Sequence, residues 1–203
     1  MSDHPLTVFL IDDDEDIRKS LQRALEKRGY AVESHASAAS FLAVYDPGRH
    51  GCLLLDYGMP EMNGLELQRH LNGLGATIPV IFITGHGGVP ESVQAIKAGA
   101  VDFLEKPFRQ ADLAERIETA FVIARDRLDH EEQRRHHRAK FQRLTARELE
   151  IVERMIARPS EISSKELAAA LGISPRTVDH HRARILEKMN VKSVAELIAL
   201  AGR

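Results

Sequence analysis

The sequence has little cysteine, no long hydrophobic run and almost no net charge. Its single cysteine, Cys52, excludes an internal disulfide, and its position in an apolar run predicts a buried, unreactive thiol in a reducing compartment. The longest apolar stretches, such as Ile78–Ile83, are far too short to cross a bilayer. Residues 1–5 carry neither the basic nor the apolar segment of an export signal. We therefore expect a cytoplasmic globular protein without a membrane partner.

The net charge of −2 conceals an acidic half and a basic half. Residues 1–120 hold 11 basic and 18 acidic side chains, a net −7, whereas residues 121–203 hold 17 and 12, a net +5. Halves of opposite charge indicate two modules with different partners, and the basic module is a candidate for binding nucleic acid. In a chain of 203 residues, each half is long enough to bury its own core.

The first 120 residues alternate short apolar runs with helical patterns. The runs are continuously apolar, which is typical of strands covered on both faces. They lie at 8–11, 30–32, 52–55, 79–83 and 101–104. Between them apolar residues recur at helical spacing, and Gly29, Gly75 and Gly99 stand where helices should end. Five β-α units in succession predict an α/β domain with a parallel sheet and helices on both faces.

The fifth helical pattern begins near Arg109 and has no clear end. Its apolar residues continue at helical spacing as far as Leu128, which suggests a coiled-coil-like connector. Most of the following stretch, to residue 143, is charged, histidine or glutamine, as in a solvated helix or a flexible linker. We expect one domain at 1–125, a charged linker at 126–143 and a second domain at 144–203.

From Leu144 onward the pattern is purely helical, and the helix starts are clearly marked. Thr145, Ser163 and Ser193 are each followed three residues later by glutamate, which is the spacing of a capping box. Ser174 before Pro175 marks a fourth start. The expected helices span 146–157, 164–171, 175–189 and 194–201. A short helix, a glycine-containing turn and a longer, more basic helix together indicate a helix-turn-helix.

Acidic side chains, a hydroxyl and a lysine follow the predicted strands at one edge of the sheet, where ligands bind in such folds. They are Asp12 and Asp13 after the first strand, Asp56 after the third, Thr84 after the fourth and Lys106 after the fifth. Carboxylates this close together need a compensating charge. Mg²⁺ supplies it, because it takes one or two carboxylates and leaves room for phosphate oxygens. The arrangement therefore predicts phosphoryl transfer to an aspartate.

These motifs resemble the receiver domain of two-component response regulators over residues 5–125. The matching strings are Ile11–Asp14, Leu55–Pro60, Ile83–Gly87 and Phe103–Phe108. Residues 144–201 resemble the LuxR/NarL-type helix-turn-helix, and the strings at 84–87 and 98–103 are most similar to the FixJ-like subgroup. The resemblance implies a (βα)5 flavodoxin-like receiver followed by an all-α, four-helix LuxR-type domain.

The resemblance also implies roles for the residues at the strand ends. Asp56 would accept the phosphoryl group, Thr84 and Lys106 would bind it, and the peptide between Lys106 and Pro107 would be cis. Phe103 would turn inward as an aromatic switch, although on periodicity alone it is more simply a core residue. Mg²⁺ or Mn²⁺ would be held by Asp12, Asp13, Asp56 and the backbone carbonyl of Gly58. His86 would be a general base or only a loop histidine beside the pocket.

The third helix of the second domain combines an apolar face with basic side chains. Val178, Ile185 and Met189 would face the core. By the same resemblance, the residues that face bases in the major groove would be Asp179, His180 and Ala183. Those that meet phosphates would be Ser174, Arg176, Thr177, Arg182, Arg184 and Lys188. The turn at 157–163 is longer than is usual in the family, and we expect it on the surface.

The expected function is a phosphorylation-dependent, DNA-binding transcription regulator that catalyses only its own phosphotransfer and dephosphorylation. A histidine kinase would phosphorylate Asp56, and a homodimer favoured by phosphorylation would bind paired half-sites in promoter DNA. One alternative is a Mg²⁺-dependent phosphatase of the haloacid-dehalogenase type, whose nucleophile lies in an Asp-x-Asp string, whereas position 58 is Gly58. The other is a receiver whose helical output domain binds protein or RNA.

Overall fold

The computed structural model describes residues 6–85 and 89–201 and divides the chain into two compact units. The first unit ends at Asp129 and the second begins at His130. Within the described residues, no helix combines the length and the apolarity that crossing a membrane requires.

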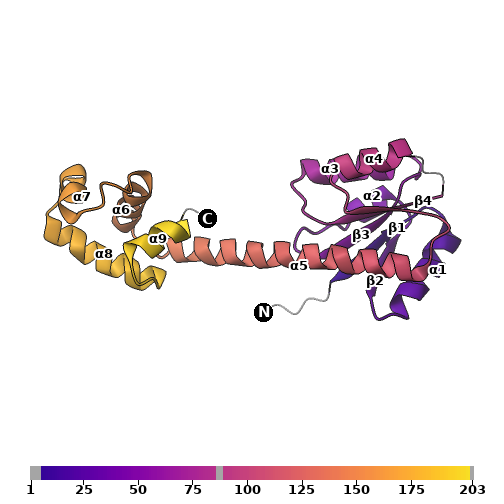
Figure 1. Cartoon of the computed structure of the whole chain (residues 1–203), viewed down its shortest axis with the longest axis horizontal. Helices are drawn as coiled ribbons and strands as arrows, with labels where there is room; N and C mark the ends of the chain where they lie inside the picture. Colours follow the sequence, from indigo (N-terminus) through magenta and orange to yellow (C-terminus); the bar gives the residue numbers. More distant parts are fainter. Residues whose placement is uncertain (1–5, 86–88, 202–203) are drawn as a thin grey trace. The chain divides into compact units, whose positions relative to one another are not determined.

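A five-stranded parallel sheet forms the centre of the first unit (Figure 1). The strands are β1 (Thr7–Ile11), β2 (Ala31–His35), β3 (Gly51–Asp56), β4 (Val80–Thr84) and β5 (Asp102–Glu105), in the spatial order β2-β1-β3-β4-β5. The order reverses between β1 and β3, and the ends of these two strands therefore flank the switch point of a flavodoxin-like sheet. The predicted fold class is confirmed.

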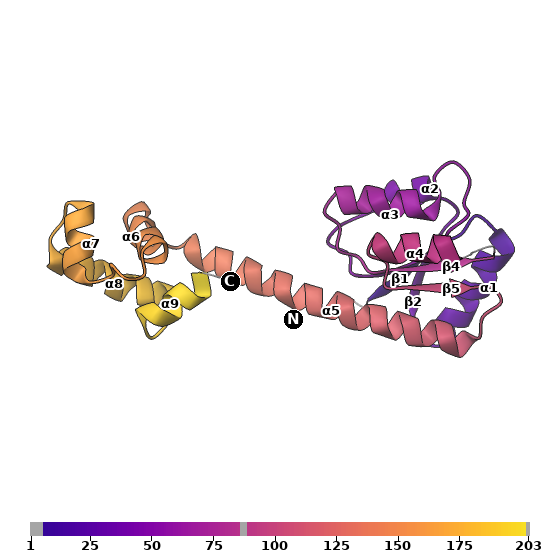
Figure 2. The same cartoon turned by 45° about the horizontal axis from the view of Figure 1, so that its top comes forward.

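Helices cover both faces of this sheet (Figure 2). They are α1 (Glu15–Glu26), α2 (Ala38–Leu42), α3 (Gly64–Gly73), α4 (Val89–Lys97) and α5 (Gln110–Phe141). Helices α1 and α5 pack on one face against strand residues such as Leu54 and Ile83. Helices α2, α3 and α4 pack on the other face against residues such as Leu53 and Phe82. Since both faces are buried, the strands read as continuous apolar runs.

The helix ends follow the local signals in the sequence. Gly29, Gly75 and Gly99, which follow α1, α3 and α4, have φ values of +91°, +73° and +95°. This left-handed backbone costs glycine little, and it ends each helix as predicted. Asp14 caps α1 by accepting hydrogen bonds from the backbone N–H groups of Asp16 and Ile17.

Helix α2 is implied by the five predicted β-α units but its position was not predicted, and α5 is longer than its apolar pattern. With only five residues, α2 is too short to show a period, although its capping box between Ser37 and Ser40 was a local signal. The charged stretch that could have been a helix or a linker continues α5 to Phe141. The boundary between the two units falls inside this helix.

The second unit contains α6 (Ala146–Ala157), α7 (Ser164–Leu171), α8 (Pro175–Met189) and α9 (Val194–Ala201), with the predicted bounds. The capping boxes at Thr145 and Ser163 are formed as expected. At Ser193 only half of the box forms, because the Glu196 carboxylate accepts from the backbone N–H of Lys192 instead. Gly172 ends α7 in a left-handed conformation and begins the turn into α8. Residues 157–160 of the long turn are exposed, as expected.

Gly64, the first residue of α3, supplies a test of how closely this helix packs against β3. A Cβ atom at position 64 would lie 2.4 Å from the carbonyl oxygen of Asp56 and 2.8 Å from Cε1 of Phe82. Because backbone cannot move aside cheaply, we expect Gly64→Ala to lower the free energy of unfolding by about 1–3 kcal/mol in urea denaturation.

The matched control is Gly73→Ala at the other end of α3, where a Cβ atom would meet nothing within 4 Å. This variant should unfold at the wild-type urea concentration or slightly above it, because alanine favours helix over glycine. Equal midpoints for the two variants would contradict the close packing.

Candidate functional site

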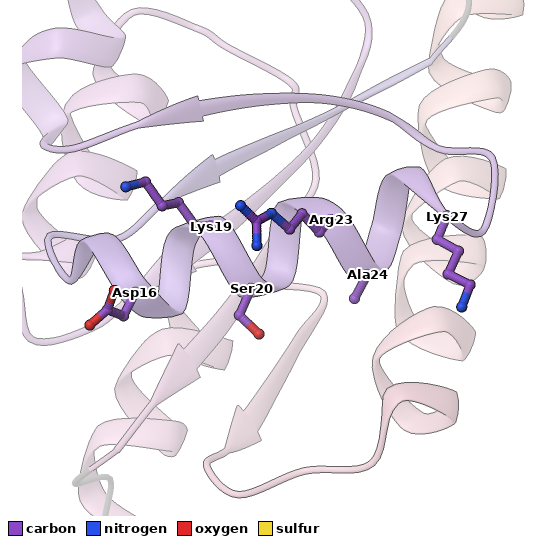
Figure 3. A pocket seen from close by; sticks show the side chains of 6 residues that line it. All are labelled: Asp16, Lys19, Ser20, Arg23, Ala24 and Lys27. Carbon is purple, nitrogen blue, oxygen red and sulfur yellow. The ribbon is translucent and has the colours of Figure 1, made fainter.

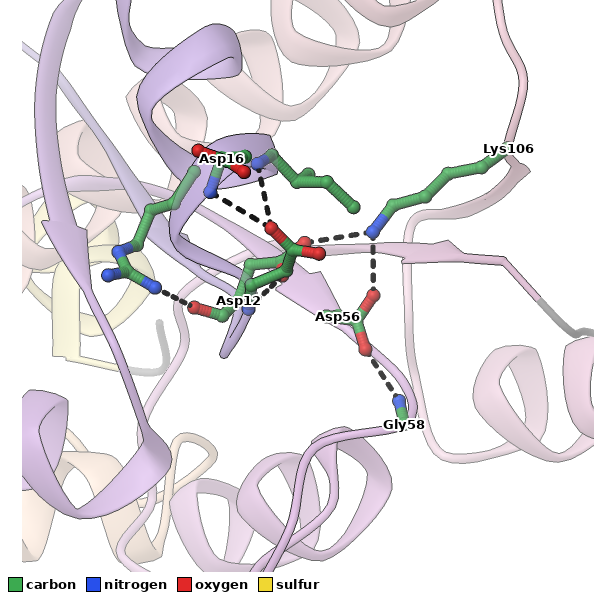
Figure 4. A network of polar contacts seen from close by, with 8 residues as sticks. Asp12, Asp16, Asp56, Gly58 and Lys106 are labelled. Atoms are coloured by element: carbon green, nitrogen blue, oxygen red, sulfur yellow. Dashed lines mark hydrogen bonds and ion pairs between the residues drawn. The ribbon is translucent and has the colours of Figure 1, made fainter.

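Three charged side chains from the ends of β1, β3 and β5 meet at the carboxyl edge of the sheet (Figure 4). Asp12 follows β1, Asp56 is the last residue of β3, and Lys106 follows β5. The Lys106 Nζ donates hydrogen bonds to Oδ2 of Asp12 at 2.8 Å and to Oδ1 of Asp56 at 2.9 Å. The lysine therefore bridges two carboxylates at the point where the strand order reverses.

Both carboxylates are largely removed from water, with exposed fractions of 1% for Asp12 and 8% for Asp56. Burial raises the pKa of Asp12 above its usual value, although the hydrogen bond and the charge of Lys106 oppose the shift. Burial alone would lower the pKa of Lys106, but its bonds to the two carboxylates raise it. The lysine stays charged and compensates the buried acids.

Backbone groups hold the other oxygens of these carboxylates. Oδ1 of Asp12 accepts from the N–H of Asp14 at 2.9 Å, and Oδ2 of Asp56 accepts from the N–H of Gly58 at 2.7 Å. Arg18 of α1 donates to the carbonyl oxygen of Asp12 at 2.7 Å and fixes the chain there. Arg18 was not predicted, because its position one turn after a helix cap is informative only once the helix is placed.

Thr84 and Phe103 lie near this edge of the sheet, on neighbouring strands. Thr84 ends β4, next to β3 in the sheet, and its exposed fraction is 3%. Phe103 on β5 is half-buried and packs against the core on the side of α2, α3 and α4, with its ring centre 6.5 Å from that of Tyr57. The burial of Phe103 is intermediate between that of a core residue and that of a surface residue. His86 lies outside the described residues.

Asp13 does not join the other two aspartates. Its side chain is exposed, and within residues 6–85 and 89–201 no group of three or more His, Cys, Asp or Glu side chains is arranged to hold a metal ion. The expectation that three carboxylates meet is therefore corrected to two, Asp12 and Asp56. The compensating charge that the sequence argument assigned to a cation comes from Lys106, which reaches both of them.

The residues at this edge nevertheless suit a small, hard cation. Mg²⁺ takes only one or two carboxylates and keeps several water ligands, so a cluster of three acids is not needed. The four carboxylate oxygens of Asp12 and Asp56 each accept one hydrogen bond, and each keeps a further lone pair. The backbone of Gly58 adjoins Asp56, which places a carbonyl group close by.

Two shallow hollows lie on the neighbouring surface. One is lined by α1 and by Lys27, which directly follows α1; the lining residues of α1 are Asp16, Lys19, Ser20, Arg23 and Ala24 (Figure 3). The other lies between α1 and the segment that follows β5, and Lys106, Pro107 and Phe108 form one wall of it. The peptide between Lys106 and Pro107 is cis, as the resemblance implied. Of these two hollows, only the second reaches the bridging lysine.

In the second unit, α8 separates a buried face from an exposed face as predicted. Val178, Ile185 and Met189 are buried in the core. The predicted DNA-facing residues that are exposed are Ser174, Arg176, Thr177, Asp179, His180, Ala183 and Arg184. Ser174 also caps α8, because its Oγ accepts from the backbone N–H of Thr177 at 3.1 Å. Arg182 and Lys188 are half-buried and have partners inside the unit.

Lys188 forms an ion pair with a buried carboxylate. Its Nζ donates to Oε2 of Glu148 at 2.6 Å, and Glu148 has an exposed fraction of 1%. Burial alone would raise the pKa of Glu148, but the bonds from Lys188 and from the N–H of Thr145 lower it to about 2. Lys188, which was predicted to contact a phosphate, is thus held in an ion pair within the unit. Glu148 was recognised only as a capping residue, since its burial depends on packing 40 residues away.

Comparisons with known proteins agree with both units. Residues 8–118 match the model of the response regulator receiver domain, and residues 142–201 match that of bacterial regulatory proteins of the luxR family. The chain is 45% identical over 201 residues to the transcriptional regulatory protein FixJ of Rhizobium meliloti, covering 97% of this chain and 96% of that protein. It is 38% identical over 203 residues to the response regulator protein TmoT of Ectopseudomonas mendocina, covering 100% and 91%. The solved structure of the response regulator StyR gives a TM-score of 0.84 at 39% identity and covers 98% of both chains.

The fold is that of a response regulator receiver joined to a helix-turn-helix domain. The chain belongs to the response regulators with a LuxR-family output domain, and it is similar to FixJ over nearly its whole length. It is a phosphorylation-dependent, DNA-binding transcription regulator. The relatives FixJ and TmoT are both named as regulators.

The ion pair between Lys188 and Glu148 gives a stability test. Lys188→Met leaves the buried Glu148 carboxylate without a compensating charge, so we expect the second unit to lose about 3 kcal/mol of stability in urea at pH 7. Because the pKa of Glu148 is lowered in the folded state, its contribution is present above pH 4.5 and is lost as the pH falls toward 2. The variant should therefore lose less stability than the wild type over that range.

The control for this variant is Lys165→Met on α7, where the lysine is exposed. It should unfold as the wild type does at both ends of the pH range. If Lys188→Met and Lys165→Met had the same urea midpoints at pH 7, the ion pair would not contribute to stability.

Proposed function

We propose that Asp56 is the phosphoacceptor and that a histidine kinase is the donor. The observation that carries this proposal is the bridge from Lys106 to the two aspartates. It places the positive charge of the lysine beside the carboxylate that must react. Of the two acids, Asp56 is the more exposed, at 8% against 1% for Asp12. Asp56 also ends β3, which lies at the centre of the sheet.

The bridge suits the chemistry of transfer to a carboxylate. An oxygen of Asp56 attacks phosphorus, a P–O bond forms, and the bond from phosphorus to the kinase histidine breaks. Catalysis of this kind depends on positioning and on neutralising charge. Gly58 fixes the direction of the carboxylate through its N–H, and Lys106 then pairs with a phosphoryl oxygen. The hydroxyl of Thr84 donates a hydrogen bond to another phosphoryl oxygen.

The cofactor of this site is Mg²⁺ or Mn²⁺. Asp12, Asp56 and the carbonyl of Gly58 would hold the cation, and Asp13 would contribute from the exposed side. When bound, the cation neutralises charge on the transferred group. The N–H of Gly58 lies against Asp56, at the position where a haloacid-dehalogenase-type phosphatase has its second aspartate. This favours a phosphoacceptor over a phosphatase.

For the output domain, we propose that α8 enters the major groove of promoter DNA. Asp179, His180 and Ala183 face bases, and the exposed Arg176 and Arg184 face phosphates. The DNA phosphates would also be met by Ser174, Thr177 and Arg182, although each of these side chains also has a hydrogen-bond partner within the unit. Phosphorylation shifts the population toward a state with Thr84 and Phe103 inward, which favours a homodimer on half-sites roughly 10 bp apart.

The first test concerns the phosphoacceptor. Asp56→Asn removes the nucleophilic oxygen, so we expect it to abolish the alkali-labile label that the wild type acquires from radiolabelled acetyl phosphate and Mg²⁺. Asp46→Asn is the control, because Asp46 is exposed in the segment before β3, at the opposite edge of the sheet. Labelling of Asp56→Asn at the wild-type level would reject the site. Sustained hydrolysis of p-nitrophenyl phosphate would favour the phosphatase instead.

The second test concerns the phosphate contacts. Arg176→Ala and Arg184→Ala should each reduce the slope of log affinity against log salt concentration by about one, measured by fluorescence anisotropy on a duplex from the chain's own upstream region. Arg69→Ala makes the same charge change on α3 of the receiver, where the side chain is exposed, and should leave the slope unchanged. Identical slopes for all three variants would contradict these contacts.

A further inference from the structure

We propose that Ser164 and Arg182 hold the carboxylate of Asp179 in one orientation and so make Asp179 the residue that selects cytosine in the major groove. This inference rests on the proposed role of α8 as the DNA-reading helix and names what one of its residues reads. Ser164 is the first residue of α7, and Asp179 and Arg182 lie on α8.

A serine hydroxyl links the two charged side chains. Ser164 Oγ donates to Oδ1 of Asp179. Arg182 donates from one guanidinium nitrogen to Ser164 Oγ at 3.2 Å and to the carbonyl oxygen of Ile162 at 3.4 Å. A hydroxyl has a single hydrogen to donate. Since arginine can only donate, the serine hydrogen is directed to Asp179, and the direction of the whole chain of bonds is fixed.

The link is anchored at its covered end and open at the other. Arg182 and Ser164 are half-buried, whereas Asp179 is exposed. Asp179 and Arg182 are three residues apart and therefore share one side of α8. Ile162 belongs to the long turn at 157–163, so this turn contacts the arginine. In the part of the chain that the structure describes, Oδ2 of Asp179 accepts no hydrogen bond and is available to a ligand.

An acceptor that is fixed in this way distinguishes the bases. A carboxylate has no hydrogen to donate, so it is repelled by the acceptors that guanine and thymine present in the major groove. Cytosine presents the N4 donor, whereas adenine places its N7 acceptor beside the N6 donor. With Oδ1 already engaged by Ser164, the single available oxygen matches cytosine best. The positive charge of Arg182, one hydroxyl away, reduces the repulsion between Asp179 and the DNA phosphates.

The test begins with selection from a pool of randomised duplex DNA by the full chain, in the presence of Mg²⁺ and beryllofluoride as a phosphoryl mimic. The affinity of the selected duplex is then compared with that of its three single-base variants at each position. We expect one position per half-site at which the wild type prefers cytosine by roughly 10-fold. Ser164→Ala should reduce this preference to about 2-fold, and Ser164→Thr, which keeps the hydroxyl, should retain it.

Asp179→Asn separates this role from a purely structural one. Because the Ser164 hydrogen still seeks an oxygen, the amide oxygen of the variant turns toward Ser164 and its NH₂ group toward the groove. We expect the preference at the same position to move from cytosine to guanine or thymine, which present acceptors. A merely structural role would weaken binding to all four duplexes equally. Should Ser164→Ala fail to fold, this exposed substitution of nearly the same shape would test the proposal by itself.

The results distinguish the selection of cytosine by Asp179 from the DNA-reading role of α8. An unchanged cytosine preference in Asp179→Asn, or in folded Ser164→Ala, would overturn the inference and leave the DNA-binding function in place. If the wild type enriched no sequence from the pool, the proposed DNA-reading role of α8 would fail, and this inference with it.

Discussion

The receiver depends on one interaction, the pair of hydrogen bonds that the ammonium group of Lys106 makes to Asp12 and Asp56. Two carboxylates buried at one sheet edge would repel each other, and the single lysine that follows β5 compensates the charge of both. The arrangement requires β1, β3 and β5 to end at the same edge, as parallel strands do. The fold thus brings together three residues that lie up to 94 positions apart in the chain.

Much of this could be predicted from local signals. The helices of the second unit begin where their N-caps predicted, because a cap is decided within three or four residues. The strands were visible because burial on both faces removes polar residues from them. The position of α2 was not predicted because a helix of five residues shows no period. The full length of α5 was left open because its last turns contain no buried side chains, and so no apolar pattern marks them as helical.

The partners of charged side chains were the least predictable feature. The sequence places Lys188 among the basic residues of α8, yet it pairs with Glu148, 40 positions earlier. Asp13 adjoins Asp12 in the sequence but is exposed while its neighbour is buried. Arg182 contacts a turn whose unusual length was noticed without its contact. In each case the charged residue can be identified from the sequence, whereas its partner depends on the packing of distant segments.

The continuity of α5 has a consequence for how the chain can be cut. The boundary between the units lies after Asp129, in a stretch rich in arginine that offers many cleavage sites to trypsin. From Gln110 to Phe141, however, the backbone is helical, and a protease needs an extended segment in its active site. In the exposed turn at 157–160, inside the smaller unit, Arg158 is followed by Pro159, and trypsin does not cleave a bond that precedes proline. The charged stretch that looks most like a linker is thus shielded from trypsin by its helical backbone, in spite of its many arginines.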